Sequence, residues 1–323
     1  MFLTALLIWT AGSATGVVLH PNGEPNLATW TDRPDNDVVG RWGYIATCVA
    51  VSSNCVLTTQ HQTSNVSWIK IGNNTYTIAQ IWNHSTADLR VVKLYGANLA
   101  HFVDTYEKTN EVGKNFITGG YGNGRGNLLQ TGGVTYGYEW DGSGNSTLRF
   151  GTNKINYTLN DRLLLGLISN VVVADFDGLG EGMSTAYEAS AGNYDSGCGW
   201  FIKDNGIWKV AGLCRAVEGH DGQSWFRDCN DPNILDPDYF DAVRISSYTT
   251  WINQTIPERL QGELTGDDWI DFADFAVFAS YWLNTDCHYP DWCLGADSEP
   301  DGDVDFADFA EFANNWLADE PPP

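Results

Sequence analysis

Basic residues are scarce in this sequence. It contains 17 Lys and Arg against 41 Asp and Glu in 323 residues, a formal net charge of −24. Proteins that bind nucleic acid neutralise phosphates with clustered Lys and Arg, so this composition argues against a nucleic-acid partner. Charged residues make up only 18% of the chain and hydrophobic residues 43%, which is typical of a globular protein and excludes a disordered one.

Long apolar runs are also lacking, and no stretch beyond the amino terminus could span a membrane. Residues 1–14 combine a short apolar core with small residues from Ala11 to Ala14. This pattern is typical of a secretory signal peptide cleaved near Ala14, although the usual positive start is missing. A buried N-terminal strand is the alternative. The signal peptide predicts a secreted or cell-surface protein.

The chain has seven cysteines, and export would favour disulfides among them. Cys287 and Cys293 are close neighbours near the carboxyl end and could pair. An odd number remains, so at least one thiol is unpaired or bonded to another chain. These five are Cys48, Cys55, Cys198, Cys214 and Cys229.

The charge is unevenly distributed and marks a domain boundary. Residues 258–323 contain 17 acidic residues and one basic residue, a net charge of −16, which leaves −8 for residues 1–257. We therefore expect a main domain over residues 15–257 and a small acidic domain over residues 258–323.

The sequence of the main domain predicts many short β-strands. Apolar runs alternate with Gly, Asn and Ser, which predicts an all-β barrel or sandwich. The predicted strands are 45–51, 55–59, 66–71, 76–81, 89–94, 115–118, 128–136, 148–150, 163–167, 171–174, 200–203 and 208–213.

Three segments carry the residue types of nucleophilic catalysis. Ser196 lies in the Gly-rich turn 193–199, His61 ends the apolar segment 56–61, and Asp88 precedes the strand 89–94. A serine hydroxyl needs a base to take its proton, and histidine suits that task when an acceptor fixes its other nitrogen. Each residue also has a plain structural reading, as a turn serine, a polar strand end or a turn aspartate.

Together these segments resemble the trypsin- and chymotrypsin-like serine proteases, which use the same order of histidine, aspartate and serine. The resemblance covers residues 38–256, and residues 247–252 look like the helix that closes the family's second barrel. It implies a trypsin-like double β-barrel, two six-stranded barrels with the site in the cleft between them. It further implies that Ser196 is the nucleophile, His61 the general base and then acid, and Asp88 the group that orients the histidine.

The resemblance also implies an oxyanion hole made by the backbone N–H groups of Tyr194 and Ser196. Tyr194 departs from the family's glycine, so this donor requires a turn that tolerates a Cβ. Ser190 resembles the floor of the primary substrate pocket, and a neutral floor disfavours a requirement for Lys or Arg. Residues 215–217 depart from the family's pattern, which leaves a restricted pocket or an altered substrate open.

Two further features are ambiguous. Residues 38–41 resemble the family's activated N-terminus, whose amine would pair with Asp195, but they lie close before His61 for the usual strands and loops. The need for an activating cleavage therefore stays open. His84 is a rival base, although a histidine four residues before the aspartate often has no catalytic role in the family.

The acidic domain contains an internal repeat. Residues 269–283 and 303–317 are identical at ten of fifteen positions at a shift of 34. Each copy places acidic residues before an amphipathic helix, and we expect the aromatic stripes of the two helices to pack on each other. The stripes are Phe272, Phe275, Phe278, Ala279 and Trp282, and Phe306, Phe309, Phe312, Ala313 and Trp316.

Oxygen-bearing residues precede each helix at the alternate positions that calcium loops use, with a glycine at position 6 of the second loop. The predicted ligands of the second loop are Asp297, Glu299, Asp301, Asp303 (through its carbonyl), Asp305 and Asp308. The first loop is degraded, with Glu263, Thr265, Asp267, Asp271 and Asp274 as ligands and Asp268 in the place of the glycine. We expect Ca²⁺ as a structural ion, bound more weakly by the first loop.

The loop–helix units resemble type I dockerin repeats, which implies a small α-helical docking domain and a cohesin-like partner. The sequence as a whole predicts a secreted serine endopeptidase that acts on protein or peptide substrates, with a calcium-binding docking domain. One alternative is an inactive protease homologue that binds a protein or peptide in its cleft. Another is an adhesion or assembly protein whose barrel does no chemistry.

Overall fold

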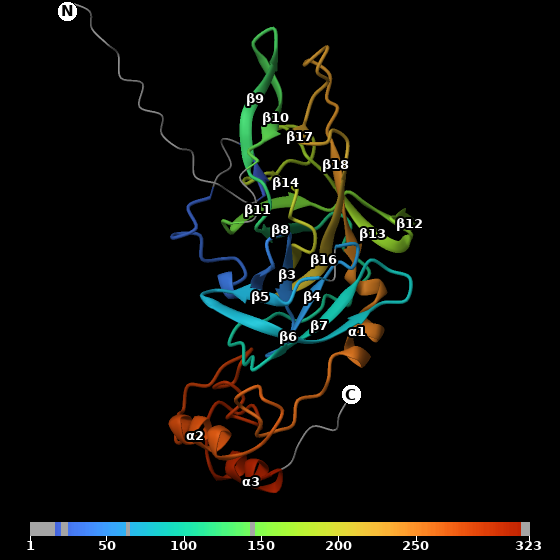
Figure 1. Ribbon diagram of the computed structural model, residues 1–323. Helices are drawn as coiled ribbons and strands as arrows, with labels where there is room; N and C mark the ends of the chain where they lie inside the picture. The colour runs from blue at the N-terminus through green and yellow to red at the C-terminus, as the bar shows by residue number, and fades with distance from the viewer. Residues whose placement is uncertain (1–16, 21–24, 63–64, 143–145, 318–323) are drawn as a thin grey trace, which may run out of the picture.

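The computed structural model describes residues 17–20, 25–62, 65–142 and 146–317. The predicted signal peptide lies outside these residues. The fold is mostly β: two β-structured halves lie above a small helical C-terminal segment, residues 258–317, in the view of Figure 1. No helix in the described ranges is long and apolar enough to cross a membrane.

The first half is a closed six-stranded barrel in the order β2-β3-β4-β7-β6-β5. Its strands are rich in Val, Ile and Cys and bury most of their side chains, as predicted from the short apolar runs. Their bounds are β2 Val39–Trp42, β3 Ala46–Ala50, β4 Cys55–Thr58, β5 Trp68–Ile71, β6 Asn74–Asn83 and β7 Arg90–Tyr95, after the 3₁₀ helix η2 Asn36–Val38.

The second half is built on a seven-stranded sheet in the order β11-β8-β15-β16-β18-β13-β12, where the resemblance implied a six-stranded barrel. These strands are β8 Asn115–Gly120, β11 Arg149–Lys154, β12 Tyr157–Leu164, β13 Leu167–Asp175, β15 Gly199–Asp204, β16 Ile207–Glu218 and β18 Tyr239–Arg244. A three-stranded sheet and a short pair complete it, from β9 Arg125–Thr131, β10 Val134–Trp140 and β17 Gln223–Trp225, and from β1 Val18–Leu19 and β14 Ala189–Ser190.

Two predicted strands are in fact turns with their flanking residues. Residues 128–136 span the end of β9 and the start of β10, because Gly132 and Gly133 both have positive φ and reverse the chain. Residues 163–167 likewise contain the hairpin between β12 and β13, with Leu165 and Gly166 at positive φ.

One apolar cluster joins the two halves. It contains Leu57 and Leu89 from the first barrel together with Phe201 and Val243 from the second half, all fully buried. The predicted helix that follows is α1 Thr249–Thr255, preceded by the 3₁₀ helix η3 Ile245–Ser247, and its Ile252 is buried in the same cluster. The cleft between the halves is therefore held by a shared core.

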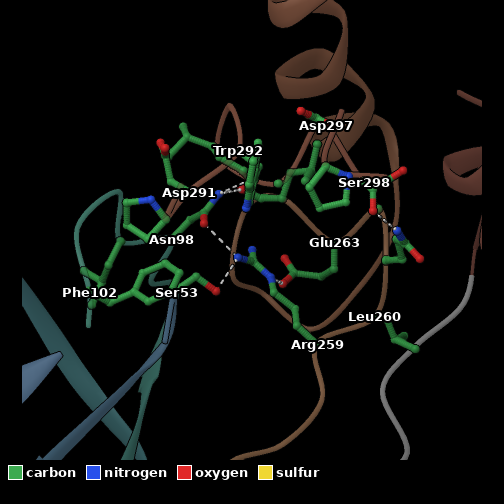
Figure 2. Close-up of a pocket in the computed structure, with 18 residues that line it drawn as sticks. Ser53, Asn98, Phe102, Arg259, Leu260, Glu263, Asp291, Trp292, Asp297 and Ser298 are labelled. Carbon is green, nitrogen blue, oxygen red and sulfur yellow. Dashed lines mark hydrogen bonds and ion pairs between the residues drawn. The ribbon is translucent and has the colours of Figure 1, made fainter. Parts of the chain in front are cut away.

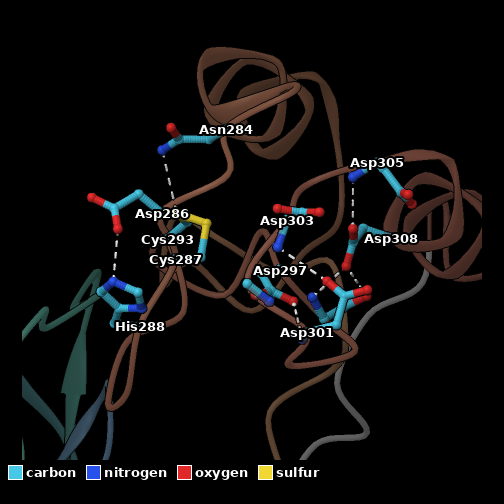
Figure 3. The surroundings of a disulfide bond; sticks show 12 residues. Asn284, Asp286, Cys287, His288, Cys293, Asp297, Asp301, Asp303, Asp305 and Asp308 are labelled. Atoms are coloured by element: carbon cyan, nitrogen blue, oxygen red, sulfur yellow. Dashed lines mark hydrogen bonds and ion pairs between the residues drawn. A yellow bond between two sulfur atoms is a disulfide. The ribbon is translucent and has the colours of Figure 1, made fainter.

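The C-terminal segment has an apolar cluster of its own around the helices α2 Phe272–Tyr281 and α3 Phe306–Asn314. Each helix begins with the same capping box, formed by Asp271 with Asp274 and by Asp305 with Asp308. The predicted Cys287–Cys293 disulfide lies beside the second loop (Figure 3). The other five cysteines form no disulfide in the described part of the chain, and four of them are buried.

Candidate active site

His61 lies between Asp88 and Ser196. Its Nδ1 is 2.6 Å from Asp88 Oδ2, and its Nε2 is 3.0 Å from Ser196 Oγ. When a carboxylate accepts from Nδ1, that nitrogen carries the proton of the neutral ring, which leaves Nε2 free to accept the serine proton. The structure thus brings together the three residues that the sequence singled out, in the arrangement that nucleophilic activation requires.

Strand pairing in the first barrel positions the histidine and the aspartate. His61 follows β4 and Asp88 precedes β7, and these two strands pair in antiparallel register. Asp88 is fully buried, and its Oδ1 accepts the N–H groups of Gln60 at 2.8 Å and of His61 at 2.7 Å. Its own N–H donates to Ser169 Oγ at 2.9 Å, so the aspartate is fixed from both sides.

The serine turn packs directly on the first barrel. The Ser196 carbonyl accepts the Thr47 N–H at 3.0 Å, and the Thr58 hydroxyl donates to the Thr47 carbonyl at 2.7 Å. Gly197 has a φ of +81°, and a Cβ there would overlap the Thr47 carbonyl and the Thr58 hydroxyl. Only glycine both adopts this positive φ readily and leaves room for the close contacts with Thr47 and Thr58. The roles of Thr47 and Thr58 could not be predicted from the sequence, because nothing near them in the chain indicates a contact with the distant serine turn.

Asp195, next to the serine, is fully buried and anchors the turn. Its carboxylate accepts the N–H groups of Gly122 at 2.8 Å, Gly192 at 2.9 Å and Val17. Burial raises the pKa of this carboxyl to about 7, against the opposing effect of these donors. Val38, proposed from sequence as the start of an activated chain, instead ends η2 and leads into β2. It is Val17 whose backbone meets Asp195.

The predicted oxyanion donors lie in a strained turn. Tyr194 has a φ of +72°, a left-handed conformation that is costly for a residue with a Cβ. The carbonyl of Asn193 accepts the Asn123 N–H at 2.8 Å, which fixes the plane of the peptide that carries the Tyr194 N–H. Within the described ranges, neither the Tyr194 nor the Ser196 N–H donates to another protein group.

A cavity of about 270 Å³ adjoins His61 and Ser196. Residues 191–194 and 214–217 form much of its lining. Ser190, predicted as its floor, does not line it, because the residue is fully buried and pairs with Val18 of β1. Arg215 contributes to the lining but is itself buried in an ion pair with Asp241.

His84, the rival base, has a structural role. Its Nδ1 accepts the N–H groups of Thr86 at 3.2 Å and Ala87 at 2.9 Å, and its ring packs edge-on against Tyr248 and Trp251. Burial lowers its pKa. The ring therefore stabilises the turn that presents Asp88.

The second acidic loop of the C-terminal segment was predicted to hold calcium. Asp297 accepts the Gly302 N–H at 2.9 Å, and Asp301 accepts the Asp303 N–H at 3.0 Å (Figure 3). Burial, followed by the charges of Asp308 and Asp301, raises the pKa of Asp297. Among the described residues, no group of three or more His, Cys, Asp or Glu side chains is arranged to hold a metal ion. The residue types fit a hard cation, and their mutual repulsion is what such a cation would relieve.

The chain is similar to known proteins in structure, whereas comparison of its sequence gives no match. No family model and no curated protein matches the sequence. Among solved structures, the chain is similar to mouse neuropsin, a serine protease expressed in the limbic system of the brain, with a TM-score of 0.44 and 19% identity. The match covers 69% of this chain and 96% of neuropsin. The function proposed below does not rest on this similarity but on the contacts of His61, Asp88 and Ser196.

Proposed function

We propose that the protein is a serine endopeptidase that cleaves peptide bonds through an acyl-enzyme on Ser196. The observation that carries this proposal is the position of His61, within hydrogen-bonding distance of both Asp88 and Ser196. The expected location remains secreted or cell-surface associated.

The geometry supports the following sequence of events. Ser196 Oγ attacks the substrate carbonyl while His61 Nε2 takes its proton, and the N–H groups of Tyr194 and Ser196 bind the developing oxyanion. His61 then gives the proton to the leaving amine, and the acyl group stays on Ser196. A water molecule then attacks the acyl carbonyl while His61 takes its proton. The bond to Ser196 Oγ breaks, the acid leaves, and His61 returns the proton to Ser196 Oγ. Asp88 orients the ring throughout and offsets the charge that it acquires.

Covalent labelling by a fluorophosphonate probe tests the proposal. The parent should be labelled, whereas Ser196→Ala and His61→Ala should lose turnover by a factor on the order of 10⁶ and show no labelling. Asp88→Asn should lower the rate about 10⁴-fold, because the ring then takes the wrong tautomer. His101→Ala is the control, because it removes an exposed histidine that does not line the cavity beside Ser196, and it should be labelled at close to the parental rate. Labelling of a folded Ser196→Ala variant would exclude Ser196 as the nucleophile.

The second candidate function is that of an inactive homologue that binds a peptide in the cleft. The left-handed conformation of Tyr194 favours it, because strain in the oxyanion turn is relieved if the turn rearranges. Saturable binding of peptides by a folded parent that resists labelling would decide for this candidate.

We also propose that the C-terminal segment is a calcium-dependent docking module for a cohesin-like protein. The spacing of acidic residues in the second loop supports the calcium ion, which would be held by Asp297, Asp301, Asp305 and Asp308. Bound there, the ion would neutralise the carboxylates that now repel one another. Phe272 and Phe306 are 77% and 75% exposed and offer the partner an apolar surface.

A further inference from the structure

The two acidic loops fold alike at their carboxyl ends. Asp274 Oδ1 accepts the Leu264 N–H at 2.6 Å, and Asp308 Oδ1 accepts the Ser298 N–H at 2.7 Å. Each aspartate also accepts, through Oδ2, the N–H of the residue that caps its helix. Any difference between the loops as metal sites therefore arises at their other positions.

The loops differ most at position 1, because the carboxylate there in the first loop is already paired with an arginine side chain. Arg259 Nε is 2.5 Å from Glu263 Oε2, and the Glu263 side chain is fully buried. Glu263 Oε1 accepts the N–H groups of Thr265 and Asp267 at 3.1 and 3.2 Å, and that of Gly266. Both carboxylate oxygens are thus engaged. Asp297, at the same position of the second loop, also accepts N–H groups through both oxygens, from Asp301 at 3.4 Å and Gly302 at 2.9 Å. Unlike Glu263, it has no basic partner among the described residues.

Arg259 also reaches into the first barrel. Its Nη1 donates to Ser53 Oγ at 3.0 Å and to Asn98 Oδ1 at 2.7 Å (Figure 2). The Asn98 amide in turn donates to the Leu264 carbonyl at 2.5 Å, inside the first loop. One guanidinium thus joins the loop carboxylate to the barrel.

Position 6 of the first loop forms an ion pair with the first barrel. Asp268 stands where the second loop has glycine, and its Oδ1 is 2.8 Å from Lys93 Nζ of β7. Beside it, the Gly96 N–H donates to the Gly266 carbonyl at 2.9 Å. A Cβ on Gly266 would lie 2.5 Å from the Ala97 carbonyl oxygen, so the loop backbone contacts the barrel backbone directly.

We propose that the first loop is not a calcium site: Arg259 and Lys93 supply its positive charge, and the loop holds the C-terminal segment on the first barrel. A calcium ion needs six or more oxygens, and in the first loop the Glu263 and Asp268 carboxylates are already paired with Arg259 and Lys93, whose positive charges would repel the ion. This proposal takes the place of the sequence-based expectation that the first loop binds calcium weakly. The chain then binds one calcium ion, in the second loop, a count that rests on the proposed docking module.

Calcium stoichiometry tests the first half of this proposal. Asp267 and Asp301 occupy the same loop position, and each accepts the N–H two residues ahead at 3.0 Å, so Asp267→Asn and Asp301→Asn are matched variants. Titration calorimetry and native mass spectrometry of the full chain should find one ion. Asp301→Asn should weaken its binding at least tenfold, and Asp267→Asn should leave it unchanged. Two ions in the parent, or an ion lost in Asp267→Asn, would overturn the proposal.

Amide hydrogen exchange tests the second half without calcium. With a chelator present, Arg259→Gln and Gly266→Ala should speed exchange at the Gly96 amide at least tenfold, because each opens the contact with the barrel. Gly113→Ala is the control, since Gly113 has the same φ of +82° as Gly266 but no atom near its Cβ direction. If the exchange rate at the Gly96 amide were unchanged in both variants, the proposal that the first loop holds the C-terminal segment on the barrel would be refuted. Because this readout needs no metal, a parent that binds no calcium would refute the docking module and leave this contact to be judged separately.

Discussion

Tyr194 combines an exposed ring with a left-handed backbone in the turn that precedes the nucleophile. A left-handed residue with a Cβ costs roughly 1–2 kcal/mol relative to the right-handed form. The turn holds it there because the Asn193 carbonyl and the Asp195 carboxylate on either side are hydrogen-bonded. The strain therefore lies at the predicted oxyanion donor.

Replacing Tyr194 by glycine should relieve this strain. We expect Tyr194→Gly to raise the free energy of unfolding by up to about 1 kcal/mol and to retain labelling by the fluorophosphonate. Tyr194→Ala removes the same ring but keeps the Cβ, so it should gain no stability. Equal stability of the two variants in thermal unfolding would show that the conformation costs little.

At the scale of single residues, the sequence predicted the site better than its surroundings. His61, Asp88 and Ser196 stood out because catalysis demands those residue types in that order. Ser190 was placed wrongly because a pocket floor depends on which strand covers it, and β1 comes from a distant part of the chain. Thr47 and Gly122, which hold the serine turn, depend on the same kind of distant contact.

At the scale of elements, α2 and α3 expose half of their aromatic stripes. Phe278 and Phe312 are 3% exposed and stack on each other, which confirms that the two stripes pack together. Phe272 and Phe306 each make an edge-on contact with a tryptophan of the other stripe, Trp316 and Trp282, but they remain 77% and 75% exposed because they lie at the ends of the stripes. Periodicity alone does not distinguish the packed end of a stripe from the exposed end.

Substitutions at exposed and at buried positions of the aromatic stripes should have different effects on stability and on surface hydrophobicity. We expect Phe272→Ser with Phe306→Ser to change the free energy of unfolding by less than about 1 kcal/mol but to reduce retention on a phenyl column. Phe278→Ser should instead destabilise the C-terminal segment by about 3–5 kcal/mol, because it empties a packed site. Thermal unfolding followed by aromatic fluorescence measures both. Strong destabilisation by the exposed pair would mean that this face is already covered.

At the scale of the whole molecule, buried carboxyls in the second half make stability depend on pH. Glu188 is fully buried, and burial raises its pKa to about 8 from an ordinary value of 4.5. The folded state therefore holds this proton more tightly than the unfolded chain does. Its contribution to stability is complete below about pH 4.5 and is lost as the pH rises to about 8.

Glu188→Gln should flatten this dependence. Between pH 5 and 8 the parent should lose stability by up to roughly 1.4 kcal/mol per pH unit from this group, and the variant should lose less. Denaturant unfolding at several pH values measures the slope. Asp195, with a pKa raised to about 7, should preserve part of the slope in the variant. An unchanged slope would mean that Glu188 ionises freely in the folded protein.

The overall architecture was only partly predictable. The closed first barrel follows from short, regularly spaced apolar runs, but β17 and β18 of the second half come from segments in which no strand was predicted. The acidic composition of residues 258–323 indicated a separate unit but not its contact with the first barrel. That contact depends on Arg259, the only basic residue in a segment of 17 acidic ones.

The same arginine has a mechanical consequence. The C-terminal segment continues covalently from the second half through α1, and Arg259 and the first acidic loop fasten it to the first barrel. It therefore connects the half that carries His61 and Asp88 to the half that carries Ser196. A rotation that widened the cleft between the halves would have to break the contacts of Arg259 and Asp268 with the first barrel. Removing the contacts of Arg259 and the first acidic loop with the first barrel should broaden the range of distances between His61 and Ser196, even though no atom of these contacts touches a substrate.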